Sequence, residues 1–157
     1  MTDSRFALRL AALTVCGAFL ASCGERASLT GPSSNGPWTG VWQGTLTDTG
    51  GSTGTLRLTL EDRALDARGS LVSGTWTTSF ADASRNGAGT VGGTVTDGVG
   101  TLLLTPATAM ACSQPIPGAA GSYALSRLTL NGRALQGAFA QLLCTNTITG
   151  ALSLTKQ

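Results

Sequence analysis

The sequence contains no histidine among its 157 residues, which removes the side chain that most often serves as a catalytic base or a metal ligand. Catalytic groups of the Ser-His-Asp or Cys-His type are therefore excluded. Charged residues are also scarce, at 11% of the chain, and the formal net charge is only +2. Because Lys and Arg are scattered singly, they form no basic cluster that would neutralise a row of phosphates. Nucleic acid is not an expected partner.

The few carboxylates offer no catalytic arrangement. Nearly all of them stand at expected turns or strand ends, and only Glu61 and Asp62 are adjacent. A solvated hairpin loop explains this pair better than the paired carboxylates of a glycosidase do. The glycines are not followed by a lysine or a helix, as a phosphate-binding loop requires. We expect no enzymatic activity, no catalytic residue and no cofactor. The carboxylates considered in the domain are Asp48, Glu61, Asp62, Asp66, Asp82 and Asp97.

The N-terminal segment has the three parts of an export signal. Arg5 and Arg9 precede an uncharged apolar run at residues 10–20, and the small residues Ala21 and Ser22 follow it. The apolar run is too short to cross a bilayer as a permanent helix, which needs about 20 residues. This order of charged, apolar and small residues is typical of a secretory signal peptide. We predict that residues 1–22 are a signal peptide.

The end of this segment, Leu20-Ala21-Ser22-Cys23, resembles the lipobox of bacterial lipoproteins. In that family the cysteine thiol receives a diacylglycerol, the signal peptide is cut before the cysteine, and the new amine often carries a fatty acid such as palmitate. The resemblance implies that Cys23 is lipidated. Cys16 does not fit the pattern, because Val15 stands where a small residue is required. The alternative is an ordinary signal peptide with an incidental cysteine at position 23.

The same resemblance implies a location. Gly24 follows the cysteine, whereas an Asp at that place commonly retains lipoproteins at the inner membrane. A lipid anchor in the bacterial cell envelope, at the outer membrane, is therefore expected, and its face stays open. Residues 23–37 are rich in Gly, Ser and Pro and show no period, which predicts a flexible lipid-anchored tether. The folded domain is expected over residues 38–157.

The domain alternates between apolar and polar residues along short segments. Near Trp42 and Leu46, every second side chain is apolar, and Leu56, Leu58 and Leu60 repeat the pattern. A period of two with one apolar face predicts half-buried antiparallel strands. We expect an all-β domain of eight strands, at residues 38–48, 54–61, 71–80, 88–95, 99–105, 123–130, 134–144 and 147–156.

Short turns between these segments favour a meander. Asp97-Gly98 and Asn131-Gly132 are typical hairpin turns, since such residues tolerate positive φ. Eight strands in this order hide their edges by closing into an up-and-down barrel, and a two-sheet β-sandwich is the alternative. The apolar face is expected to point inward, unlike that of a membrane-spanning barrel. Glycines inside strands indicate sharp coiling or close backbone approach; they are Gly44, Gly74, Gly92 or Gly93, Gly137 and Gly150.

Gly40-Val41-Trp42 resembles the Gly-x-Trp of the lipocalin and avidin group of barrels. That resemblance implies an eight-stranded barrel that binds a small apolar molecule. The possible ligand-lining residues are Trp42, Trp76, Phe80 and Phe139. These rings could instead fill a solid core. The protein would then be a structural or interaction protein of the envelope, or an inhibitor-like one, acting through its outer surface and loops on an envelope protein.

The cysteines of the domain number two, Cys112 and Cys144. In an exported protein disulfides persist, so we expect these two residues to be bonded. The bridge would hold the longest loop, at residues 105–121, against the seventh strand or the turn after it. That loop could serve as a lid, as a partner-facing surface or only as a pinned connection. No metal site is expected from two thiols without a histidine.

Overall fold

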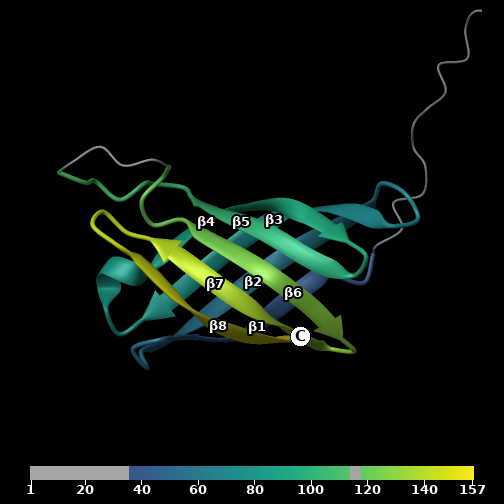
Figure 1. The fold of residues 1–157 in the computed structure, drawn as a ribbon, viewed down its shortest axis with the longest axis horizontal. Helices are drawn as coiled ribbons and strands as arrows, with labels where there is room; N and C mark the ends of the chain where they lie inside the picture. Colours follow the sequence, from purple (N-terminus) through teal and green to yellow (C-terminus); the bar gives the residue numbers. More distant parts are fainter. Residues whose placement is uncertain (1–35, 114–117) are drawn as a thin grey trace, which may run out of the picture. The chain divides into compact units, whose positions relative to one another are not determined.

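The computed structural model describes residues 36–113 and 118–157, which form eight antiparallel strands closed into a barrel (Figure 1). Each strand pairs with the next in the chain, and the last pairs with the first. The predicted up-and-down barrel is confirmed and the β-sandwich is excluded. The strands are β1 (Gly40–Asp48), β2 (Thr53–Ala64), β3 (Gly69–Phe80), β4 (Gly87–Thr96), β5 (Val99–Pro106), β6 (Tyr123–Asn131), β7 (Ala134–Leu142) and β8 (Thr147–Lys156).

The expected signal peptide at residues 1–22, Cys23 and the tether up to residue 35 lie outside the described residues. Ser34–Gln157 is one compact unit, and all eight strands and the hydrophobic core belong to it. Within the described part of the chain, no helix is long and apolar enough to cross a membrane.

Apolar and polar residues that alternate along the sequence face alternately the interior and the exterior of the barrel. In β2 every second residue from Gly54 to Asp62 is buried, and the residues between them are exposed. Side chains of a strand point alternately to its two faces, so one apolar face supplies the interior. The buried faces of all eight strands meet in one hydrophobic cluster that includes Trp42, Leu58 and Leu154.

Inward glycines permit the strands to coil tightly. A Cβ on Gly44 would overlap the carbonyl oxygen of Ser153 in the neighbouring β8. Gly93 meets the backbone of β5 in the same way, whereas a Cβ on Gly92 would enter open space. Of this pair, Gly93 is therefore the position that requires glycine. The glycines whose Cβ would crowd a carbonyl oxygen of an adjacent strand include Gly44, Gly74, Gly89, Gly93, Gly137 and Gly150.

The two ends of the barrel differ. The loop end, at the left of Figure 1, carries the β1–β2, β3–β4, β5–β6 and β7–β8 connections. The chain enters at the opposite, N-terminal end, where Trp38 is only 2% exposed. The Trp38 carbonyl oxygen accepts a 2.8 Å hydrogen bond from Trp42 Nε1. The backbone N–H of Trp38 donates to Asp62 Oδ2 at 3.2 Å. Trp38 thus closes the N-terminal end.

This arrangement corrects the interpretation of Glu61 and Asp62 as a solvated loop. β2 continues to Ala64, and Asp62 is a buried residue of that strand. Strand β2 extends beyond the predicted end at residue 61 because hydrogen bonds hold Asp62 in place. The Asp62 carboxylate accepts the Trp38 N–H, and the Asp62 N–H donates to Thr39 Oγ1 at 2.9 Å. The partners come from the chain entrance, more than twenty residues away, and local sequence gave no indication of them.

Other boundaries moved by smaller amounts. Asp97 and Gly98 form the predicted two-residue turn, with φ of 49° and 80°. The turn expected at Asn131-Gly132 lies one residue later, because Asn131 still pairs with Ala134. The seventh strand ends at Leu142 and not at Cys144.

Candidate functional site

The four predicted ligand-lining residues all lie in the hydrophobic cluster, and their exposed fractions run from 0% at Trp42 to 7% at Phe80. Three of them lie toward the loop end. Tyr123 connects two of these, with ring centroids 5.5 Å from Trp76 and 6.2 Å from Phe139. Trp42 lies toward the N-terminal end against Trp38, so the structure does not bring all four rings to one place.

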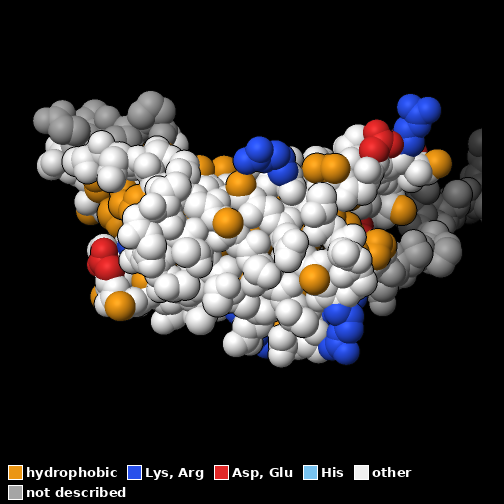
Figure 2. All heavy atoms as spheres, turned by 60° about the horizontal axis from the view of Figure 1, so that its bottom comes forward, with side chains coloured by type: hydrophobic (Ala, Val, Ile, Leu, Met, Phe, Trp, Pro, Cys, Tyr) orange, Lys and Arg blue, Asp and Glu red, His pale blue; other side chains and the backbone are white. Residues whose placement is uncertain are grey.

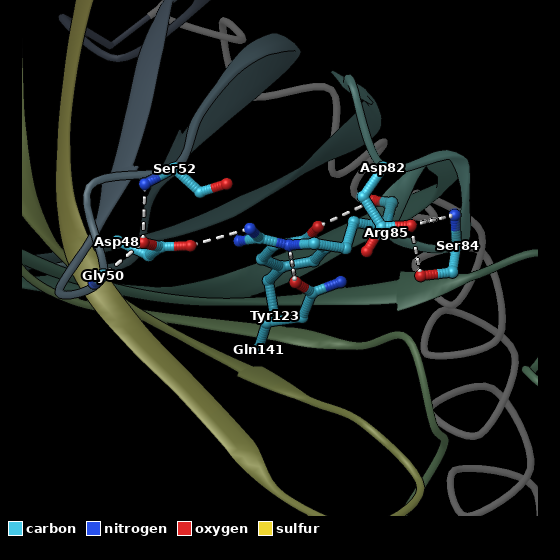
Figure 3. Close-up of polar contacts among 8 residues, drawn as sticks. All are labelled: Asp48, Gly50, Ser52, Asp82, Ser84, Arg85, Tyr123 and Gln141. Carbon is cyan, nitrogen blue, oxygen red and sulfur yellow. Dashed lines mark hydrogen bonds and ion pairs between the residues drawn. The ribbon is translucent and has the colours of Figure 1, made fainter.

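A buried arginine crosses the loop end above these rings. Arg85 ends the short 3-10 helix η1 (Ala83–Arg85), which connects β3 and β4, and only 4% of it is exposed. Its Nη1 donates a 2.7 Å hydrogen bond to Asp48 Oδ2 at the end of β1, and its Nε donates to Gln141 Oε1 in β7 at 3.0 Å (Figure 3). Its Cζ lies 3.9 Å from the centroid of the Phe80 ring. One side chain therefore links three separate parts of the barrel rim.

The backbone of Arg85 is held as firmly as its side chain. The Arg85 carbonyl oxygen accepts hydrogen bonds from Tyr123 Oη at 2.9 Å and from Thr78 Oγ1 at 3.1 Å. Asp82 caps η1 by accepting the Ser84 N–H and hydroxyl at 3.0 and 2.7 Å. Residues 81–87 separate the third and fourth expected strands, and the sequence did not indicate a buried arginine there, because a lone Arg between Ser and Asn looks like any surface turn.

Asp48 is built to stay ionised beside this arginine. Burial alone would raise the pKa of Asp48, but the Ser52 N–H, the Arg85 guanidinium and the Gly50 N–H together outweigh it and hold the pKa below the ordinary 3.8. Both N–H groups donate to Oδ1 at 2.9 Å. Burial raises the pKa of Tyr123 above 10.0, although hydrogen bonds from neighbouring side chains and the charge of Arg85 partly oppose the shift. Tyr123 is therefore neutral at physiological pH.

One donor of this network remains unused. Nη2 of Arg85 is buried and has no hydrogen-bond partner within residues 36–113 and 118–157. A buried donor without a partner costs about 1–3 kcal/mol, so each such group in a native structure calls for a physical account.

A hollow of about 580 Å³ opens beside Arg85, between η1 with the start of β4 and the β5–β6 connection. Arg85 and Gln141 supply polar groups, and most of the wall is small or apolar. Figure 2 shows hydrophobic side chains gathered at this end of the molecule, at the left. The lining residues are Ser84, Arg85, Asn86, Gly87, Ala88, Pro106, Ala107, Thr108, Ala109, Met110, Gly121 and Gln141.

Both walls of this hollow are fixed in place. The predicted disulfide between Cys112 and Cys144 is confirmed, and it ties the β5–β6 connection to the segment after β7. Backbone hydrogen bonds add to it: Met110 N–H donates to the Ala120 carbonyl oxygen at 3.0 Å, and Ala107 N–H donates to that of Ala88 at 2.9 Å. Of the roles considered for the long loop, the pinned connection matches this geometry. The described residues of this loop form one wall of the hollow.

Other hollows lie on the outer face of the barrel. One of about 250 Å³ is lined mainly by outward Thr, Ser, Gln and Arg side chains of β1 to β3. Another of about 610 Å³ lies where β7 and β8 meet β6 and the end of β1, and its lining includes Asp48, Arg127 and the predicted ligand-lining residue Phe139. In the described residues, no group of three or more Cys, Asp or Glu side chains is placed to hold a metal ion.

Comparison of the chain with protein-family models, with curated proteins and with solved structures finds no match. The geometry of the loop end is therefore the basis on which a function is proposed.

Proposed function

We propose that this protein is a lipid-anchored lipoprotein of the bacterial cell envelope that binds a small, largely apolar molecule in the hollow at the loop end. The lipobox-like sequence at residues 20–23 supports the anchor and the compartment. A disulfide-bonded domain suits an exported protein, because exported compartments preserve disulfides. In this role the protein binds its ligand and does not catalyse a reaction.

The observation that carries the binding role is a mostly apolar hollow with two fixed walls. Its volume of about 580 Å³ lies inside the range of ligand sites, roughly 300 to 1,000 Å³. The ion pair of Arg85 fixes one wall, and the disulfide fixes the other. A site that needs no ordering on binding keeps more of its contact free energy as affinity.

The loop-end hollow is a better place for the ligand than the barrel interior. Trp42 and Trp76 are 0% and 2% exposed and pack into the core, and Arg85 lies across the loop end. A ligand inside the barrel would have to displace these groups. The hollow accepts a ligand without such a change.

The position of the tether agrees with this role. Gly36 lies at the N-terminal end, where its N–H donates to the Asp62 carbonyl oxygen at 3.4 Å. A lipid on Cys23 would therefore attach the barrel by the end opposite the hollow.

The binding role is tested by filling the hollow. The barrel unit, residues 34–157, is produced by secretion so that its disulfide forms, and it is titrated with the uncharged dye Nile red. Ala109 lies in the exposed wall of the hollow, so Ala109→Trp should weaken dye binding by about tenfold or more through lost volume. Ala67→Trp is the matched control, because Ala67 is also exposed and lies in the β2–β3 turn at the N-terminal end.

Equal dye binding by both variants and the unsubstituted unit would contradict the proposal, as would the absence of stoichiometric binding. Capture of an envelope protein by a surface that Ala109→Trp leaves intact would instead favour the interaction role.

A further inference from the structure

The unused donor of Arg85 gives chemical information about the ligand that the proposed function leaves open. The guanidinium is a buried cation with two of its nitrogens engaged, Nη1 by Asp48 and Nε by Gln141. Its third nitrogen, Nη2, is buried without a partner among the described residues. The other hydrogen-bonding groups of Arg85 in this network have partners, so Nη2 is the position at which a further acceptor would bind.

The geometry of a guanidinium defines where that acceptor would lie. Nε and Nη2 share one edge of the planar group, and their N–H bonds on that edge are parallel, so the edge suits two oxygen acceptors side by side. In this protein one acceptor, Gln141 Oε1, stands at that edge. Gln141 itself lines the hollow, as Arg85 does. Because Nη2 is buried, an atom bound in the hollow would reach this second position only by entering beside the Gln141 side chain.

The charges around Arg85 decide the kind of acceptor. Asp48 is ionised at neutral pH and already neutralises the guanidinium. Asp82, at the start of η1, is an exposed carboxylate whose pKa is lowered chiefly by two hydrogen bonds from Ser84, so the buried counter-charge is that of Asp48; Tyr123 is neutral. A further carboxylate from a ligand would leave buried negative charge uncompensated, which is costly in a low-dielectric site. An uncharged oxygen adds no such charge.

We infer that the molecule bound in the hollow combines an apolar body with an uncharged carbonyl oxygen, as in an amide, ester or ketone, and that this oxygen accepts a hydrogen bond from Arg85 Nη2. The apolar body lies along the wall formed by Pro106, Ala109 and Met110. This inference rests on the proposed binding function and adds the chemical class of the ligand. Arg85 is then the residue that selects the head group, and the β5–β6 connection supplies the apolar contact.

The test compares two probes with the same chain. Octanamide and octanoate are titrated at neutral pH into the ¹⁵N-labelled barrel unit, and NMR follows the backbone of the hollow and the Arg85 Nε–H. Octanamide should bind about tenfold more tightly, which is the lower end of the range for a hydrogen bond to a charged group. It should also move the Arg85 Nε–H resonance and the side-chain amide of Gln141, while octanoate should not.

Arg85→Lys is the informative variant, since it keeps the positive charge for Asp48 but has no Nη2. It should bind both probes with similar, weak affinity. If this variant fails to fold, the Arg85 Nε–H resonance of the unsubstituted unit still shows whether octanamide contacts Arg85.

Equal or tighter binding of octanoate overturns the inference, as does octanamide binding that leaves the Arg85 Nε–H resonance unmoved. In both cases the hollow remains a binding site. If Nile red binds and neither probe does, the carbonyl class is wrong. If Nile red fails as well, the proposed function falls.

Discussion

Arg85 alone connects several distant parts of the chain at the loop end. Its side chain reaches Asp48, 37 positions earlier in the chain, and Gln141, 56 positions later. Removing one partner of such a buried pair leaves an uncompensated charge, which destabilises a protein far more than loss of an exposed pair. None of this could be predicted from the sequence, because a turn arginine and a strand-end aspartate are ordinary surface residues until closure of the barrel brings them together.

Asp48→Asn is therefore expected to lower the melting temperature of the barrel unit at neutral pH, because Arg85 would lose its counter-charge. The pKa of Asp48 is lowered on folding, so its contribution is complete above the ordinary value of 3.8 and disappears as the pH falls through the folded value. Thermal unfolding followed by circular dichroism at about pH 7 and about pH 2 measures both effects. The difference between variant and unsubstituted protein should shrink at the lower pH.

Asp97→Asn is the control, because Asp97 lies in an exposed two-residue turn and Asn also tolerates its positive φ of 49°. It should leave the melting temperature nearly unchanged. A difference for Asp48→Asn that persists at the lowest pH would show that the charge of Asp48 is not what stabilises the loop end.

At the scale of elements, the strands were largely predictable and their inward glycines only partly so. Alternation identified all eight strands, because side-chain direction along a strand is a local property. The sequence also singled out glycines inside strands but left Gly92 and Gly93 as alternatives. The structure distinguishes them, since Gly93 contacts β5 and Gly92 contacts nothing within 4 Å. That choice depends on the pairing of two strands, which one strand alone does not encode.

Two alanine substitutions test this difference. In Gly44→Ala the new methyl group would overlap the Ser153 carbonyl oxygen, at the β1–β8 seam that closes the barrel. The free energy of unfolding should fall by about 1–3 kcal/mol or more, as for other overpacked sites. Gly92→Ala should instead be neutral or stabilise by about 0.4–1 kcal/mol, because it restricts only the unfolded chain. Urea unfolding measures both, and equal effects would refute a specific need for glycine at the seam.

At the scale of the whole molecule, closure and the disulfide turn eight strands into a frame with two different ends. The bridge spans 32 positions, and closing a loop of that size stabilises a protein by about 3–4 kcal/mol in the chain-entropy model. Trp38 closes one end, and Arg85 with the pinned connection shapes the other. The entrance of the chain and the hollow therefore lie at opposite ends, as the proposed anchored binding protein requires.

The anchor itself has a direct test in the full chain. Cys23→Ser should leave an unprocessed precursor that incorporates no labelled fatty acid, because the thiolate is the group that takes the lipid. Cys16→Ser is the matched control and should be processed and labelled normally. Metabolic labelling with palmitate and membrane fractionation in a diderm bacterial host give the readout. A trimmed, unlipidated product from unsubstituted protein would contradict the lipoprotein proposal.

The sequence by itself determined the all-β class and the eight strands, and it favoured the closed meander and the pairing of Cys112 with Cys144. These follow from local alternation, short turns and the count of cysteines left in the domain. Only the tertiary structure decided that Asp62 is buried beneath the chain entrance, that Gly93 and not Gly92 meets its neighbour, and that Arg85 crosses the loop end to Asp48. Such contacts join distant positions, and their partners are set by register and closure, which exist only once every strand has paired.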